Sequence, residues 1–154
     1  MTESPEIHDP YFYMELALKQ ARQSEKDVPV GAVIVLDGSV ISVGVNNRER
    51  SLDPTGHAEI VALRKAAQNL NDWRLTGCQI YVTLEPCAMC AEALIQARVS
   101  TIVFGAYDPR SGACGSAFNL FVGGRPYPMP EIVGGIMEAE CRQMLTDFFR
   151  SPGP

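Results

Sequence analysis

Apolar and polar residues follow two different periods along this chain, and together these periods predict a mixed α/β fold. Apolar residues recur at three- and four-residue spacing in several segments, which is typical of amphipathic helices. The predicted helices span residues 11–26, 57–68, 86–97 and 136–150. Short apolar runs that are rich in β-branched residues predict buried strands. These runs span residues 28–36, 40–45, 78–84, 101–106 and, more briefly, 131–133.

Turn-forming residues indicate how these elements are connected. Asp37-Gly38 lies between the first two strands and is a strong signal for a two-residue hairpin. The remaining strands alternate with helices, and residues 107–130, rich in Gly, Pro and Ser, predict a long loop. This order predicts one α/β unit in which helices cover a mixed sheet.

Composition and charge narrow the class of protein. The chain has 154 residues, 46% of them hydrophobic and 20% charged, which suits one domain over residues 1–154 with loose ends at 1–8 and 151–154. No apolar run reaches the roughly 18–20 residues of a membrane span, and the N-terminus does not resemble a signal peptide. We therefore expect a cytoplasmic protein. A net charge of −5 argues against indiscriminate nucleic-acid binding, which depends on cationic neutralisation of phosphates.

Three residues have the spacing of a metal site. Cys87 and Cys90 lie three apart at a predicted helix start, where free N–H groups and the helix dipole favour thiolates. His57 lies at a second predicted helix start. Three protein ligands that leave a fourth position for water are typical of catalytic zinc, whereas structural zinc normally has four protein ligands.

Glu59 adds acid–base chemistry to this pattern. It lies two positions after His57, so it can face a metal-bound water without being a ligand. Alone, a Cys-x-x-Cys pair is also typical of redox centres and structural half-sites, and a lone His-x-Glu has little meaning. Their combination favours a catalytic zinc site. Cys78 and Cys141 lie on apolar stripes and are expected in the core.

The same residues resemble a known signature. His57-Ala58-Glu59 with Pro86-Cys87-Ala88-Met89-Cys90 is similar to the H-x-E…P-C-x-x-C signature of the cytidine and nucleobase deaminases. Further segments between about residues 11 and 150 resemble the bacterial tRNA-specific adenosine deaminases. These segments are VPVGAVIV, Asp53-Pro54-Thr55, HAEI, Trp73-Arg74-Leu75, YVTLEPCAMC, Val103-Phe104-Gly105-Ala106, Gly115-Ser116 and Phe148-Phe149.

This resemblance implies a three-layer α-β-α cytidine-deaminase-like fold with a central mixed five-stranded sheet, and a homodimer. It implies that His57, Cys87 and Cys90 bind one Zn²⁺ per chain and that Glu59 moves protons. It also implies that the substrate is the wobble adenosine of a tRNA anticodon loop, which becomes inosine. The implied substrate contacts are the amide of Asn46, the backbone of Ala58, the pocket walls Val30 and Leu84, and Asp108, beside the anticodon loop.

Two alternatives remain beside wobble adenosine deamination. Gly56, the loop 123–130 (GGRPYPMP) and the uncharged end SPGP depart from the family pattern. The last two departures remove expected RNA contacts and favour deamination of a free nucleobase or nucleoside, such as guanine, cytosine or a modified purine. A non-catalytic zinc module is the other alternative, and the presence of Glu59 argues against it.

If RNA is the substrate, cationic residues should gather around the site despite the negative net charge. Several arginines fall in predicted loops or at a helix end, where we expect them to face one groove. They are Arg48, Arg50, Arg74, Arg110, Arg125 and Arg150.

Overall fold

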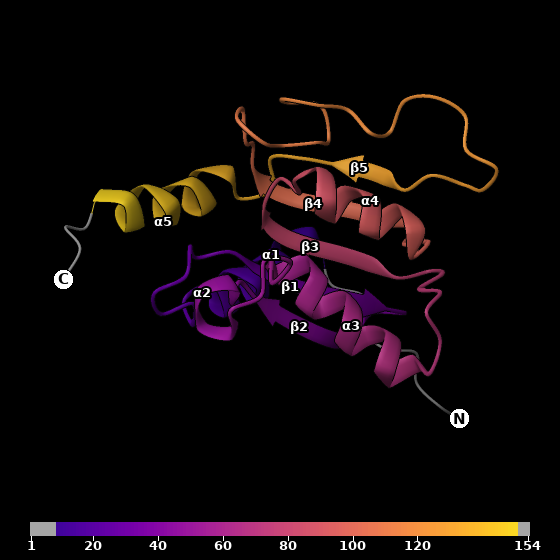
Figure 1. The fold of residues 1–154 in the computed structure, drawn as a ribbon, viewed down its shortest axis with the longest axis horizontal. Helices are drawn as coiled ribbons and strands as arrows, with labels where there is room; N and C mark the ends of the chain where they lie inside the picture. Colours follow the sequence, from indigo (N-terminus) through magenta and orange to yellow (C-terminus); the bar gives the residue numbers. More distant parts are fainter. Residues whose placement is uncertain (1–8, 151–154) are drawn as a thin grey trace.

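The computed structural model describes residues 9–150, so the ends predicted to be loose lie outside the described residues. The helices are α1 (Pro10–Ala21), α2 (Arg48–Ser51), α3 (Ala58–Leu70), α4 (Ala88–Gln96) and α5 (Glu138–Arg150). The strands are β1 (Gly31–Leu36), β2 (Ser39–Val45), β3 (Gln79–Leu84), β4 (Thr101–Ala106) and β5 (Glu131–Val133). They form one sheet in the order β2-β1-β3-β4-β5 (Figure 1).

The sheet is mixed, as the sequence predicts. β1 pairs antiparallel with both β2 and β3, whereas β3, β4 and β5 run parallel. The β1–β2 connection is the predicted hairpin: Asp37 and Gly38 have φ values of 50° and 80°. Positive φ at both central residues is the conformation that a two-residue type I′ turn requires.

Helices cover both faces of the sheet, which gives the expected three layers. Successive side chains on β1, β3 and β4 alternate between two buried clusters. One cluster, beneath α3 and α4, includes Ile34, Ile80 and Ile102. The other, beneath α1 and α5, includes Val33, Tyr81 and Val103. Burial on both faces explains why these strands appear in the sequence as continuous apolar runs. Cys78 and Cys141 are buried, as predicted.

Two predictions were wrong: where the first helix ends, and that the polar stretch before residue 57 contains no helix. The first helix ends at Ala21 and not near residue 26, and Glu25 adopts a φ of 56°, which no helix continues. The polar stretch before residue 57 contains the unpredicted short helix α2. The buried carboxylate of Asp27 accepts hydrogen bonds from the backbone N–H groups of Glu49 (2.7 Å) and Arg50 (3.4 Å). Because Asp27, which stabilises the start of α2, lies far from it in the sequence, no local apolar pattern predicts this helix.

A close helix–sheet contact fixes the helix that carries the predicted histidine. Gly44 on β2 lies so close to α3 that a Cβ atom there would collide with the backbone at Ala58 and Ala62. Glycine therefore lets the start of α3 rest directly on the sheet, beside the start of β1 and the end of β3. Among the described helices, none is long and apolar enough to cross a membrane.

Candidate active site

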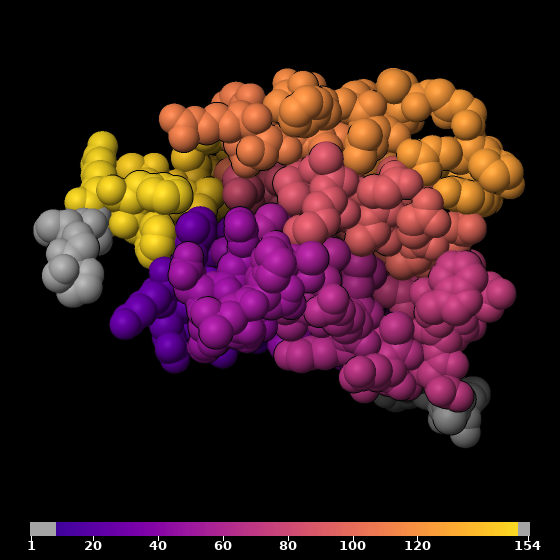
Figure 2. All heavy atoms as spheres, viewed as in Figure 1, coloured from indigo at the N-terminus to yellow at the C-terminus, as the bar shows by residue number. Residues whose placement is uncertain are grey.

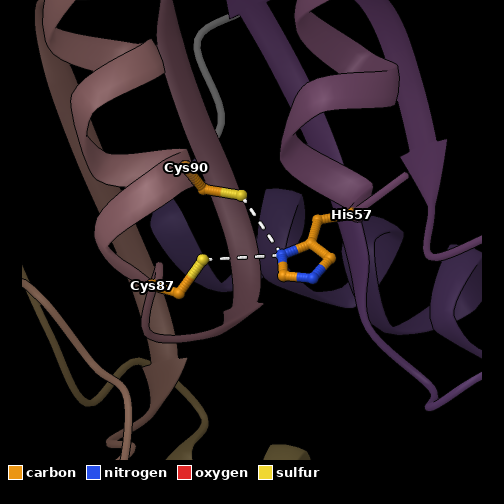
Figure 3. A group of neighbouring side chains, drawn as sticks. All are labelled: His57, Cys87 and Cys90. Carbon is orange, nitrogen blue, oxygen red and sulfur yellow. Dashed lines mark hydrogen bonds between the residues drawn. The ribbon is translucent and has the colours of Figure 1, made fainter. Parts of the chain in front are cut away.

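Two helix N-termini meet at one end of the sheet and bring the three predicted ligands together (Figure 3). His57 is the N-cap of α3, Cys87 is the N-cap of α4, and Cys90 lies in the first turn of α4. The Nδ1 atom of His57 lies 3.5 Å from the Sγ atom of Cys87 and 3.4 Å from that of Cys90. Both caps have extended backbone and lack side-chain capping bonds, so their side chains are free to face one another.

These distances fit a zinc ion. Zinc bonds of about 2.3 Å to sulfur and 2.0–2.1 Å to nitrogen, at tetrahedral angles, place sulfur and nitrogen about 3.6 Å apart. The three ligand atoms all lie within 4.8 Å of one another, and within residues 9–150 no other His, Cys, Asp or Glu joins this group. One imidazole and two thiolates are a typical zinc donor set. His57, Cys87 and Cys90 therefore fit the metal and leave a coordination position free.

Contacts among the three side chains shift the pKa values of His57, Cys87 and Cys90. Hydrogen bonding from Cys90 lowers the pKa of Cys87 to about 4, and the same contact raises the pKa of Cys90. The hydrogen bond with Cys87 is the main cause that raises the pKa of His57. The Cys87 thiolate is thus stabilised before any metal binds, and metal binding displaces the shared protons.

Glu59 lies in the first turn of α3, beside this cluster. Its side chain is only 4% exposed, and burial is the main cause that raises its pKa to about 7. Glu59 also lines the cavity that holds His57 and Cys87. The carboxyl group is therefore shielded from bulk water while facing the space in which a substrate would lie.

A cavity of about 540 Å³ opens over the cluster, large enough for a nucleobase and its neighbours. All five predicted substrate contacts line it: Asn46, Ala58, Val30, Leu84 and Asp108. The structure thus places these residues around one space, and their individual contacts with a substrate stay predictions. The cavity lies at the carboxyl ends of β3 and β4, next to the loop that follows β4.

Two of these residues are held firmly by the backbone. The Nδ2 atom of Asn46 donates to the carbonyl of Val28 (3.2 Å), and its Oδ1 atom accepts from the N–H of Arg48 (3.4 Å). The carboxylate of Asp108 accepts from the N–H groups of Arg110 (3.0 Å) and Ser111 (3.2 Å), which closes a turn. Both side chains are therefore oriented before a ligand arrives.

The last helix adds residues that the sequence analysis missed as parts of the site. Arg142, Leu145 and Phe149 of α5 line the same cavity. Figure 2 shows α5 (yellow) projecting at one end of the molecule, beside segments from the N-terminal half. Phe149 is 69% exposed, although the helix has an apolar stripe that packs on the sheet. The signal in the sequence was the pair Phe148-Phe149, one of the segments that resemble the tRNA-specific adenosine deaminases.

The prediction that six arginines face one groove was wrong. Arg48 and Arg110 line the cavity, together with Arg142, which was not among the six. Arg74 lines a separate hollow of about 570 Å³ with Ser100, Thr101 and Glu131, at the start of β4 and β5. Because parallel strands begin at one edge and end at the other, this hollow lies at the opposite end of the strands. Arg125 instead binds Glu92 on α4.

Fold and site together define a zinc-binding deaminase. The family model of the cytidine and deoxycytidylate deaminase zinc-binding region matches residues 8–106, which include all three ligands and Glu59. The tRNA-specific adenosine deaminase of Bacillus subtilis (strain 168) is 44% identical over 140 residues, which cover 90% of this chain and 87% of that protein. The chain belongs to the family of tRNA-specific adenosine deaminases.

Solved structures agree with this membership. One from a study of A-to-I editing by tRNA:A34 deaminases at the wobble position of transfer RNA has a TM-score of 0.84 and 42% identity, covering 87% of this chain and 99% of that one. Guanine deaminase from Bacillus subtilis is more distant, with a TM-score of 0.65 and 28% identity over 95% of this chain and 99% of that one. The fold is shared with base deaminases, and the sequence is closer to the tRNA enzymes.

Proposed function

We propose that this protein hydrolyses adenosine to inosine at the wobble position of a tRNA anticodon and releases ammonia. The observation that carries the chemistry is a buried carboxyl group, Glu59, beside three zinc ligands in a cavity that fits a base. The observation that supports the substrate is the 44% identity to a tRNA-specific adenosine deaminase. An anticodon loop presents its wobble base already unpaired, so little energy is needed to insert it into the cavity.

Glu59 moves the protons in this reaction. His57, Cys87 and Cys90 would hold a zinc ion, which when bound would lower the pKa of a water molecule to roughly 7. Glu59 would accept the proton that this water loses as its oxygen bonds to C6 of adenine. Glu59 then donates a proton to the exocyclic nitrogen, the C6–N bond breaks, and ammonia leaves. Proton transfers by Glu59 thus accompany both bond formation and bond cleavage.

The other cavity residues hold the base for this attack. Val30 and Leu84 provide apolar walls for the flat faces of the purine. The amide of Asn46 and the backbone of Ala58 bind the edge of the base and the adjoining ribose, since an amide both donates and accepts hydrogen bonds. Asp108 lies where nucleotides that flank the target would pass.

Deamination of a free nucleobase or nucleoside is the second candidate. It is favoured by the 28% identity to a guanine deaminase and by the loop 123–130, which departs from the pattern expected of the tRNA enzymes. Incubating the purified protein with an adenine-bearing anticodon stem–loop, and separately with free bases and nucleosides, distinguishes the two. Inosine in the RNA supports the first candidate, and ammonia from free bases alone supports the second.

The quaternary structure and the location belong to the same proposal. As the family resemblance implies, the protein acts as a homodimer in the cytoplasm. Analytical ultracentrifugation of the zinc-loaded protein measures the first point, and a single species at the mass of one chain would contradict it. Fractionation of cells that produce the protein measures the second.

A further inference from the structure

A second buried carboxylate lies beside the metal ligands, and the mechanism above does not use it. Glu85 follows β3 directly, two residues before Cys87, and its side chain is only 2% exposed. Its Oε1 atom accepts from the N–H of Asp108 (3.0 Å) and from the hydroxyl of Ser116. Its Oε2 atom accepts from the N–H groups of Cys114 (3.0 Å) and Ser116 (3.2 Å). All these donors come from one loop segment, residues 108–116.

Two further contacts bind the same segment to the turn that carries Glu85. The N–H of Ala113 donates to the carbonyl of Pro86 (2.8 Å), and Gly112 forms an isolated bridge with Cys87. A Cβ atom on Gly112 would collide with the carboxyl group of Glu85, so the loop backbone passes directly over it. The carboxylate is therefore the centre around which this loop folds.

The first part of the segment forms a wall of the cavity. Asp108, Pro109, Arg110 and Ser111 all line the space above the cluster. The N–H of Asp108 binds Glu85, and the side chain of Asp108 in turn orients the backbone of Arg110 and Ser111. A chain of hydrogen bonds thus runs from the buried carboxylate to the residues at the cavity surface.

We propose that Glu85 is a positioning residue for substrate binding, which holds residues 108–116 so that Asp108 and Arg110 meet the RNA beside the target base. This inference deepens the proposed function and rests on it for the identity of the substrate. Four donors converge on two oxygens, and only a carboxylate accepts from all of them. The amide of a glutamine would direct N–H groups at other donors and leave buried groups unpaired.

The test uses the zinc-loaded Glu85→Gln protein, which keeps the size of the side chain. Amide exchange measured by NMR should quicken about tenfold or more at Asp108, Cys114 and Ser116, the scale of losing one hydrogen bond to a charged group. The KM for an adenine-bearing anticodon stem–loop should rise roughly 10- to 100-fold, the scale of losing one hydrogen bond to a charged group, while kcat changes far less. Zinc content should match that of the wild type.

Glu92→Gln is the matched control, since Glu92 is a carboxylate on α4 outside the cavity. It should leave KM unchanged.

If Glu85→Gln does not fold, Ser116→Ala removes one donor at an exposed position and should also raise KM, by a smaller factor. Unchanged KM and unchanged exchange in the substituted protein would overturn the proposal, and so would loss of zinc with normal loop exchange. Failure of the wild type to deaminate the stem–loop would instead overturn the proposed function. In that case, exchange at the amides of Asp108, Cys114 and Ser116 still tests the role of Glu85.

Discussion

Two residues separated by one position, His57 and Glu59, occupy different places in one helix start, and we propose different tasks for them. His57 is the extended N-cap, so its ring turns away from the helix toward the thiols. Glu59 is within the first turn and is buried against the cavity. The spacing of the motif thus places the proposed metal ligand and the proposed proton carrier at separate positions, so each group can be tested alone.

Removing the Glu59 carboxyl group should abolish turnover and leave the metal in place. We expect Glu59→Ala to lower kcat by about 10²- to 10⁴-fold, the usual contribution of a positioned acid–base group. Inosine formation in single-turnover assays measures the rate, and elemental analysis measures zinc. Turnover near the wild-type value would show that another group moves the protons.

Removing the two thiols should abolish metal binding. The Cys87→Ala/Cys90→Ala double variant leaves His57 alone, and a single imidazole does not hold zinc at a site of this kind. We expect elemental analysis to find essentially no zinc in the purified protein. Cys114→Ala is the control, because Cys114 lies in the following loop and outside the cluster, and it should retain full zinc. Full zinc occupancy in the double variant would contradict the ligand assignment.

At the scale of elements, the predictable parts are those whose cause is local. The hairpin at Asp37-Gly38, the buried strands and the two helix starts that carry the ligands all follow from neighbouring residues. Helix α2 depends on the distant carboxylate of Asp27, and the position of α5 depends on packing against β4. Helix α5 contributes Arg142, Leu145 and Phe149 to the cavity. The cluster of His57, Cys87 and Cys90 was therefore predictable, and the part of the cavity wall that α5 forms was not.

The loop 123–130, which departs from the family pattern, is anchored to α4 by side chains. Arg125 makes two hydrogen bonds of 3.0 Å to the carboxylate of Glu92, and the guanidinium of Arg98 stacks 3.5 Å from the ring centre of Tyr127. Gln96 also donates to the hydroxyl of Tyr127 (3.2 Å). Figure 2 shows this orange segment lying against α4. Side chains of the loop itself, Arg125 and Tyr127, therefore make the contacts that hold it near α4.

We expect Arg125→Ala to loosen this loop without unfolding the protein. A partly exposed ion pair contributes at most about 1 kcal/mol, which corresponds to roughly fivefold faster local exchange. Hydrogen exchange over residues 123–130 measures the loosening, and the melting temperature should change little. Arg64→Ala, which removes a comparable surface pair with Asp53, is the control and should leave exchange in the loop unchanged. Equal exchange in both variants would show that the loop is held by its backbone.

At the scale of the whole molecule, the cavity and the second hollow lie at opposite ends of the strands and are lined by different arginines. Arg48, Arg110 and Arg142 line the cavity at the carboxyl ends of β3 and β4, whereas Arg74 lies at the starting edge of the parallel strands. Net charge is −5, so the protein as a whole repels RNA, and attraction depends on this local group. The location of cations matters more here than their number.

This arrangement limits how strongly RNA binding depends on salt. Each phosphate neutralised on a single strand contributes about −0.7 to the slope of log K against log salt, so three cavity arginines predict a slope near −2.

Arg142→Ala should weaken binding of the anticodon stem–loop and reduce the magnitude of that slope by about 0.7, because it removes one cation from the cavity. The fold should persist, since the i,i+4 pair of Arg142 with Glu138 on α5 contributes only about 0.3–0.5 kcal/mol. Arg74→Ala, at the far edge, should leave both affinity and slope unchanged. Fluorescence anisotropy at several salt concentrations measures these slopes, and equal effects of the two variants would mean that the RNA extends across the whole sheet and is not confined to one end of it.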